Sequence, residues 1–180
     1  MRVIAGKYGS RNIETLKGMT TRPTSDKVRA AIFSKIGPYF NDETFLDVFG
    51  GSGAMSLEAL SRGMKRVTIL EKDIRASKMI QKNIDAFNEN ENCQLIKGDS
   101  LKILEQLPQT FDYIFIDPPY AYEHTETIIK MIIDNQIVEE SGLIIVETDL
   151  RYDLPEKISG FGCVNLKKYS KTVVRYYEKG

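Results

Sequence analysis

The sequence contains one histidine, two cysteines and no tryptophan. The two cysteines, Cys93 and Cys163, are too few for a disulfide scaffold or a cysteine-rich metal site. His124 alone cannot build a histidine-ligated zinc or iron centre, so no metal is expected. The purely apolar runs are short, such as residues 143–146. A transmembrane helix needs about 20 such residues and is therefore excluded.

The first residues also lack the apolar stretch of a signal peptide. A chain of 180 residues that is 42% hydrophobic and 28% charged has enough apolar material for a packed core. These features predict a soluble, reduced, cytoplasmic protein that does not associate with membranes.

The formal net charge is zero, but the charges are unevenly distributed along the chain. Residues 1–40 carry eight Lys or Arg against two acidic residues, and residues 163–180 carry five against one. Residues 41–162 carry 12 basic against 22 acidic residues. If both basic ends lie on one face, they form a positive surface suited to phosphate groups. Solvated surface lysines and arginines explain the same pattern equally well.

From residue 44 onward, β-rich runs alternate with helical patterns. This alternation predicts a doubly wound, mainly parallel α/β sheet of Rossmann-like type. The last two runs, joined by a short turn, predict an antiparallel hairpin, which gives seven strands in total. Strands are expected at 44–49, 66–71, 93–97, 111–116, 143–147, 162–169 and 172–178, and helices at 54–62, 74–87, 100–107 and 124–135.

Residues 1–40 are predicted to form a small basic appendage, and residues 41–180 the main domain. Segments 2–5 and 12–16 are candidates for a hairpin. Thr24 or Ser25 is a candidate N-cap for a helix that runs to Ile36. This unit is too small to bury much core by itself.

A glycine-rich loop, Asp47-Val48-Phe49-Gly50-Gly51-Ser52-Gly53, follows the first expected strand. Ligands of open α/β sheets bind at the carboxyl ends of strands, so this loop is a candidate cofactor site. It lacks the Gly-Lys-Ser/Thr of a phosphate-binding loop, which argues against nucleotide hydrolysis. A dinucleotide fingerprint would need glycine at position 56, which is Ser56, so a nicotinamide cofactor is also disfavoured.

Acidic residues stand at the ends of three successive expected strands: Asp47, Glu71 and Asp99. Glu71 is placed to accept the two ribose hydroxyls, and Asp99 to accept an adenine amino group. Asp47 favours a ligand that carries a positive charge. Together the three acids indicate an adenosine with a cationic tail, which describes S-adenosylmethionine.

The tetrapeptide Asp117-Pro118-Pro119-Tyr120 follows the fourth expected strand. Two prolines fix the backbone and remove two N–H donors, which leaves rigid acceptors. The Asp117 carboxylate and the Pro118 carbonyl are suited to hold an exocyclic –NH2 group and to direct its lone pair at a methyl sulfonium. Tyr120 offers a ring for stacking a base.

These motifs resemble those of the class I S-adenosylmethionine-dependent amino-methyltransferases. Two segments are similar to the RsmD-type bacterial 16S rRNA guanine-N2 methyltransferases: Arg22-Pro23-Thr24-Ser25-Asp26-Lys27-Val28-Arg29-Ala30-Ala31-Ile32-Phe33 and Leu57-Glu58-Ala59-Leu60-Ser61-Arg62-Gly63. The resemblance covers nearly the whole chain. One departure is Gly50, where the family more often has alanine; it removes no functional group.

The resemblance implies methylation of one guanine N2 in 16S rRNA, within an assembling small-subunit particle. It implies that the catalytic residues are Asp117, Pro118, Pro119 and Tyr120. The residues implied for cofactor binding are Asp47, Phe49, Gly51, Gly53, Glu71, Lys72, Asp99 and Ser100. The residues implied for RNA binding are Arg22, Thr24, Lys27 and Arg29.

Three alternatives stay open at this stage. The same tetrapeptide serves adenine-N6 methylation of DNA, although 180 residues leave no evident target-recognition domain. A catalytically idle RNA-binding assembly factor on the same scaffold, and a nicotinamide-dependent oxidoreductase, are the others. Lys27 and Arg29 also fit a solvated amphipathic helix, and His124 fits an ordinary surface residue.

Overall fold

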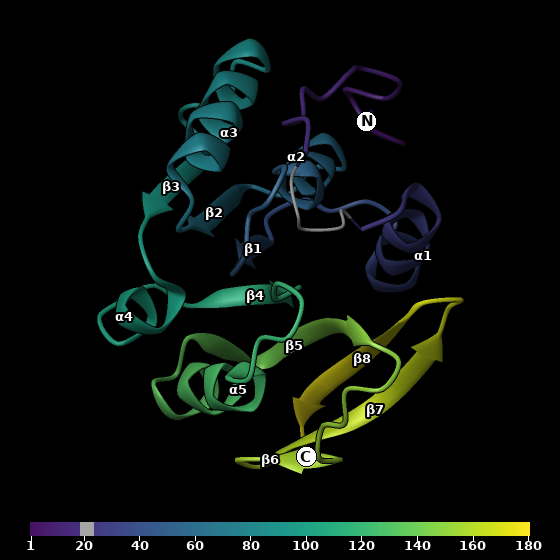
Figure 1. The fold of residues 1–180 in the computed structure, drawn as a ribbon, viewed down its shortest axis with the longest axis vertical. Helices are drawn as coiled ribbons and strands as arrows, with labels where there is room; N and C mark the ends of the chain where they lie inside the picture. The colour runs from purple at the N-terminus through teal and green to yellow at the C-terminus, as the bar shows by residue number, and fades with distance from the viewer. Residues whose placement is uncertain (19–23) are drawn as a thin grey trace.

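The structure is a computed structural model that describes residues 1–18 and 24–180. Within these residues, one sheet has the strand order β3-β2-β1-β4-β5-β8-β7-β6 (Figure 1). The strands are β1 Thr44–Asp47, β2 Arg66–Glu71, β3 Cys93–Lys97, β4 Phe111–Ile116, β5 Val138–Asp149, β6 Lys157–Ile158, β7 Phe161–Lys168 and β8 Thr172–Lys179. The helices are α1 Asp26–Ile36, α2 Ala54–Ser61, α3 Ile74–Ala86, α4 Ser100–Leu104 and α5 Thr125–Asp134.

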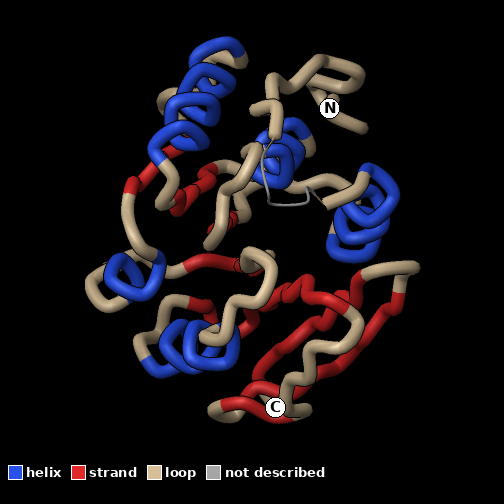
Figure 2. Tube along the Cα trace, viewed as in Figure 1, coloured by secondary structure: helices blue, strands red, loops and turns tan. Residues whose placement is uncertain are grey.

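Strands β3, β2, β1, β4 and β5 run parallel, and β8 and β7 continue the sheet antiparallel. The chain moves outward from β1 through β2 to β3 and then returns to β4 on the other side of β1. The order therefore reverses between β1 and β4, and crevices at such a reversal are where open α/β sheets bind ligands. Figure 2 shows the strands as one twisted band with helices on both sides.

Successive strand residues pack alternately into two hydrophobic cores, one on each face of the sheet. Phe45 packs in the core under α1, α2 and α3, whereas its neighbour Leu46 packs in the core under α4 and α5. Tyr176 and Tyr177 on β8 divide in the same way. This period of two is what a sheet covered on both faces requires. In the described part of the chain, no helix is long and apolar enough to cross a lipid bilayer.

The predicted Rossmann-like doubly wound fold with a terminal antiparallel hairpin is confirmed, with one correction to the strand count. The sheet has eight strands rather than seven, because the two-residue strand β6 pairs with the outer edge of β7. Strand β5 also begins five residues earlier than expected, at Val138, with a register shift against β4. Helix α4 ends at Leu104, three residues before the predicted end.

The N-terminal segment lies against the main domain. The expected hairpin is reduced to one bridge between Arg2 and Asn12. Val3 and Ile13 pack with Leu57 of α2 and form a third hydrophobic cluster. Helix α1 begins where the Ser25 hydroxyl accepts the amide of Val28. Its buried side chains belong to the core under α1, α2 and α3.

Candidate functional site

The glycine loop joins the carboxyl end of β1 to α2. Gly51 and Gly53 have φ angles of +57° and +79°, a backbone region that favours glycine. Gly50 is needed for a different reason, because a Cβ there would lie 2.5 Å from Cγ2 of Ile69. Ile69 thus occupies the space that an alanine at position 50 would use. The loop is held close to the sheet, and its backbone faces the end of β2.

Asp47, the last residue of β1, lies beneath this loop and is 1% exposed. Its Oδ2 accepts the hydroxyl hydrogen of Ser56 on α2, at 2.8 Å. Among the described residues, no donor is in hydrogen-bonding geometry to Oδ1, although that atom is buried. Burial raises the pKa of Asp47 to about 7, and the Ser56 hydroxyl opposes this shift. A nearby positive charge would favour the ionised carboxylate.

Glu71, the last residue of β2, contacts the glycine loop from the side opposite Asp47. Its Oε2 accepts the amide of Gly51 at 2.7 Å, and its Oε1 accepts the amide of Asp73 at 2.8 Å. The side chain is half-buried. Both carboxylate oxygens are thereby oriented at the rim of the loop, where each keeps further acceptor capacity.

Asp99 and Ser100 follow β3 and begin α4. Asp99 caps this helix by accepting the amide of Leu101 at 3.0 Å, and Lys72 Nζ lies 3.9 Å from its Oδ2. The Ser100 hydroxyl donates to the carbonyl of Val48 at 2.7 Å, which ties the end of β3 to the end of β1. The structure thus brings the predicted cofactor residues to the carboxyl ends of three adjacent strands.

A cavity of about 700 Å³ lies on the other side of the strand-order reversal, beside the carboxyl ends of β4 and β5. The tetrapeptide forms one wall, with Asp117 half-buried and Tyr120 84% exposed. The ring of Phe49, from the glycine loop, meets the ring of Tyr122 edge-on at 5.2 Å. Since Tyr122 also lines the cavity, this ring contact joins the loop to the cavity wall.

Two carboxylates of this site contact one hydroxyl. Thr24 Oγ1 lies 3.1 Å from Asp117 Oδ2 and 2.7 Å from Glu147 Oε2. Glu147 lines the cavity from within β5, two residues before that strand ends, and is 4% exposed. Sequence reasoning did not select Glu147, although it comes directly after the apolar run 143–146, as Asp117 comes directly after β4. The same strand-end rule could have found it.

The outer rim of the cavity is basic and aromatic. Lys27 at the start of α1, Arg151 after β5 and Lys171 in the β7–β8 turn are exposed and line it. The half-buried rings of Tyr152 and Tyr169 line it as well. Cations at the rim and carboxylates further in suit a ligand that has an anionic end and a hydrogen-bond-donating end.

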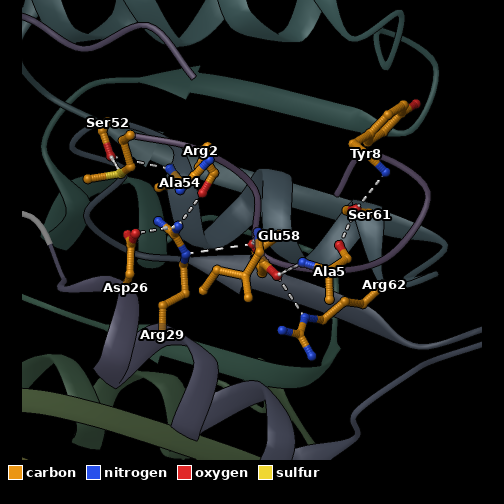
Figure 3. A network of polar contacts seen from close by, with 12 residues as sticks. Arg2, Ala5, Tyr8, Asp26, Arg29, Ser52, Ala54, Glu58, Ser61 and Arg62 are labelled. Atoms are coloured by element: carbon orange, nitrogen blue, oxygen red, sulfur yellow. Dashed lines mark hydrogen bonds and ion pairs between the residues drawn. The ribbon is translucent and has the colours of Figure 1, made fainter. Parts of the chain in front are cut away.

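Arg29, predicted to contact RNA, lies instead in the interior. It is fully buried, and its Nη2 donates to the Arg2 carbonyl at 2.5 Å and to Asp26 at 3.2 Å. Its Nε lies 3.6 Å from Glu58 Oε2 (Figure 3). Burial lowers the pKa of Arg29, and the Glu58 carboxylate opposes that effect. Arg22, the other arginine in this prediction, lies outside the described residues.

Glu58 on α2 is the centre of this buried network. It accepts the backbone amides of Ile4 and Ala5 at 2.8 and 3.1 Å, and Arg62 Nε at 2.8 Å. Figure 3 shows Ala5 of the N-terminal segment and Arg62, directly after α2, converging on Glu58. The network fixes the N-terminal segment and α1 to the helix that follows the glycine loop.

The single histidine stands apart from this chemistry. His124 precedes α5, is exposed, and its ring meets that of Tyr122 edge-on at 5.6 Å. Among the described residues, no cluster of three His, Cys, Asp or Glu side chains could hold a metal ion.

Comparison with known proteins gives a consistent set of relatives. The model of the family described as conserved hypothetical protein 95 matches residues 1–178. A Bacillus subtilis protein named as an rRNA methyltransferase is 34% identical over 99% of both chains. The ribosomal RNA small subunit methyltransferase D of Haemophilus influenzae is 36% identical over 83% of this chain and 79% of its own.

The fold comparison agrees with the sequence comparison. A solved structure from Escherichia coli, named as a methyltransferase, superposes with a TM-score of 0.90. It is 30% identical and covers 99% of this chain and 97% of its own.

Proposed function

The chain belongs to the conserved hypothetical protein 95 family, the RsmD-type rRNA methyltransferases, and on this basis we propose that it methylates the exocyclic N2 amine of one guanine in 16S rRNA. The observation that carries the proposal is the placement of Asp117-Pro118-Pro119-Tyr120. This tetrapeptide walls a cavity large enough for a nucleobase, and the cavity adjoins the glycine loop through the contact of Phe49 with Tyr122.

S-adenosylmethionine is the cofactor, and the residues around the glycine loop fit it. Among the described residues, a Cβ added at Gly51 would meet nothing within 4 Å, so there is open space over the loop. The carboxylate of Asp47 beneath the loop is buried, interacts with the Ser56 hydroxyl and the Phe49 amide, and would gain from a positive charge nearby. Glu71 would accept the ribose hydroxyls, and Asp99 with Ser100 would border the adenine.

Phe49 and Lys72, two further residues implied for cofactor binding, lie at the boundary of this site. Phe49 would form an apolar boundary between cofactor and base. Lys72 stands beside Asp99, exposed at the outer edge of the same site.

When bound, the cofactor supplies a methyl group on a positively charged sulfur. The Asp117 carboxylate and the Pro118 carbonyl would accept the two amine hydrogens and so direct the nitrogen lone pair toward that methyl group. Pro119 keeps this turn rigid, and the exposed ring of Tyr120 would stack on the base. The nitrogen gains the methyl group and loses one proton, which Asp117 is placed to accept.

The substrate assignment to small-subunit rRNA, within an assembling particle in the cytoplasm, has two supports. Two relatives carry rRNA methyltransferase in their names. The rim cations Lys27, Arg151 and Lys171 would contact phosphates on either side of a target base that has left its stack.

Transfer of tritium from labelled S-adenosylmethionine tests the proposal. The purified protein is offered naked 16S rRNA, small subunits from cells that lack the protein, and DNA rich in adenine. We expect label in rRNA or in small subunits, with the modified nucleotide identified by mass spectrometry as N2-methylguanosine. Label in adenine, or none in any substrate, would refute the assignment.

A further inference from the structure

Asp117 and Glu147 occupy equivalent positions on neighbouring parallel strands. Ile116 of β4 is paired in register with Val146 of β5, so the two carboxylates follow a matched pair of residues. Both line the cavity, and both lie within hydrogen-bonding distance of the Thr24 hydroxyl. The cavity therefore presents two carboxylates close to each other at the carboxyl edge of the sheet. The neighbouring strands β4 and β5, which position them, can be followed in Figure 1.

A hydroxyl has a single hydrogen, so Thr24 donates to only one of these carboxylates at a time. Each ionised carboxylate has about four lone-pair sites on its two oxygens. The hydrogen of Thr24 fills at most one of these sites on either carboxylate. A ligand edge with several adjacent donors would therefore complement this part of the cavity.

The Watson–Crick edge of guanine has such a pattern. Its N1–H lies next to the N2 amine, so donors stand side by side. Adenine has an acceptor, N1, beside its own amine. A carboxylate placed against that acceptor would bring two lone pairs together in a buried site, which is unfavourable.

We propose that Glu147 is a specificity-determining residue that accepts the N1–H of the target guanine while Asp117 holds its N2 amine. This inference rests on the proposed function. The low exposure of Glu147, 4%, makes the discrimination strong, because water cannot compensate for a mismatched base at a buried carboxylate.

If Glu147 had only a structural role, the expected effect of replacing it would be different. If Glu147 only fixes Thr24, and through it Asp117, its loss would slow the reaction of every base that presents an amine at the same position. If Glu147 contacts N1, its replacement changes the relative rates of two bases that differ at N1. The ratio of the two rates separates these cases.

The test compares guanine with 2-aminopurine, which keeps the 2-amino group but has an acceptor at N1. Small subunits are assembled with either base at the methylated position, mapped beforehand by mass spectrometry. The kcat/KM for methyl transfer is measured for the wild-type protein, Glu147→Gln and Asp149→Asn. The glutamine amide can donate to N1 of 2-aminopurine. Asp149→Asn removes an exposed carboxylate from the same cavity wall.

For the wild type and for Asp149→Asn we expect a preference for guanine of at least about 100-fold. For Glu147→Gln we expect this preference to fall at least about tenfold. If the wild-type protein prefers guanine by less than threefold, the inference is overturned. It is also overturned if Glu147→Gln prefers guanine as strongly as the wild type does. No transfer to guanine by the wild-type protein refutes the proposed function itself, and the inference with it.

Discussion

Arg29 of α1 and Glu58 of α2 form an ion pair in the interior of the protein, with Arg29 Nε 3.6 Å from Glu58 Oε2 and both side chains fully buried. Glu58 also pairs with Arg62, which is 5% exposed. Glu58 is thus the one carboxylate shared by the two guanidinium groups, and Asp26 is a second partner of Arg29. Buried charges are tolerated only when they are paired and hydrogen-bonded, so the stability of this region depends on Glu58.

Replacing Glu58 with alanine should lower the free energy of unfolding by about 3 kcal/mol or more, because buried Arg62 would lose its carboxylate partner and buried Arg29 would keep only Asp26. Urea unfolding followed by circular dichroism measures the change. The matched control is Glu14→Ala, which removes an exposed pair with Lys82 at 2.7 Å and should cost less than about 1 kcal/mol. Equal costs for the two variants would contradict the network's role in stability.

Titration of the Asp47 carboxyl makes the free energy of unfolding depend on pH. Its folded-state pKa is raised to about 7 by burial, from 3.8. In the folded protein the carboxyl therefore keeps its proton to higher pH than in the unfolded chain. Stability contributed by this group is greatest below pH 4 and is lost as the pH rises to about 7, by on the order of 4 kcal/mol at most.

Asp47→Asn removes this titration. We expect the stability of the wild type relative to Asp47→Asn to be higher at pH 5 than at pH 8, as measured by urea unfolding of both proteins. Other titrating groups are shared by the two proteins and cancel in the comparison. A stability difference that stays constant between the two pH values would show that Asp47 does not titrate in this window.

Asp117→Asn tests the clamp on the amine. The amide replaces one acceptor oxygen with a donor, so methyl transfer should fall by at least about 100-fold. The affinity for S-adenosylhomocysteine, measured by calorimetry, should stay within about threefold, since Asp117 faces the cavity beyond the glycine loop. Asp112→Asn, at the opposite end of β4, is the control for loss of a carboxylate from this strand. Normal turnover by Asp117→Asn would refute the mechanism.

Tyr120→Ala tests base stacking. The ring is 84% exposed, so its removal should change the free energy of unfolding by less than about 0.5 kcal/mol. The kcat/KM for rRNA should fall about 10- to 100-fold, the range expected for one lost stacking contact. Tyr120→Phe should retain activity because it keeps the ring. Tyr39→Ala, at an exposed tyrosine that does not line the cavity, should behave as wild type.

The sequence was sufficient to predict the doubly wound sheet because its strands and helices alternate with clear periods and end at glycines and caps. The motifs at Gly51 and at Pro118 were found for the same reason, since each follows an apolar run at a strand end. The two-residue strand β6 could not be predicted, because Lys157–Ile158 is stabilised by pairing with β7 and not by a local pattern.

The interior position of Arg29 was also beyond local reasoning. A helix that begins with alternating charges predicts solvent exposure, and the partner that allows burial, Glu58, is 29 residues away in the chain. Glu147 is different, since its place directly after the apolar run 143–146 was visible in the sequence. What the sequence lacked was the register of β4 with β5, which puts Glu147 beside Asp117.

The two amides that Ile4 and Ala5 donate to Glu58 limit how this family can be recombined. A chimaera that took its first 40 residues from a relative would have to match the donor segment to the acceptor helix α2. A donor segment that lacked an arginine at position 29, or that placed the amides of residues 4 and 5 elsewhere, would leave Glu58 with Arg62 alone. Transplanting the N-terminal segment would therefore require redesigning α2 together with it.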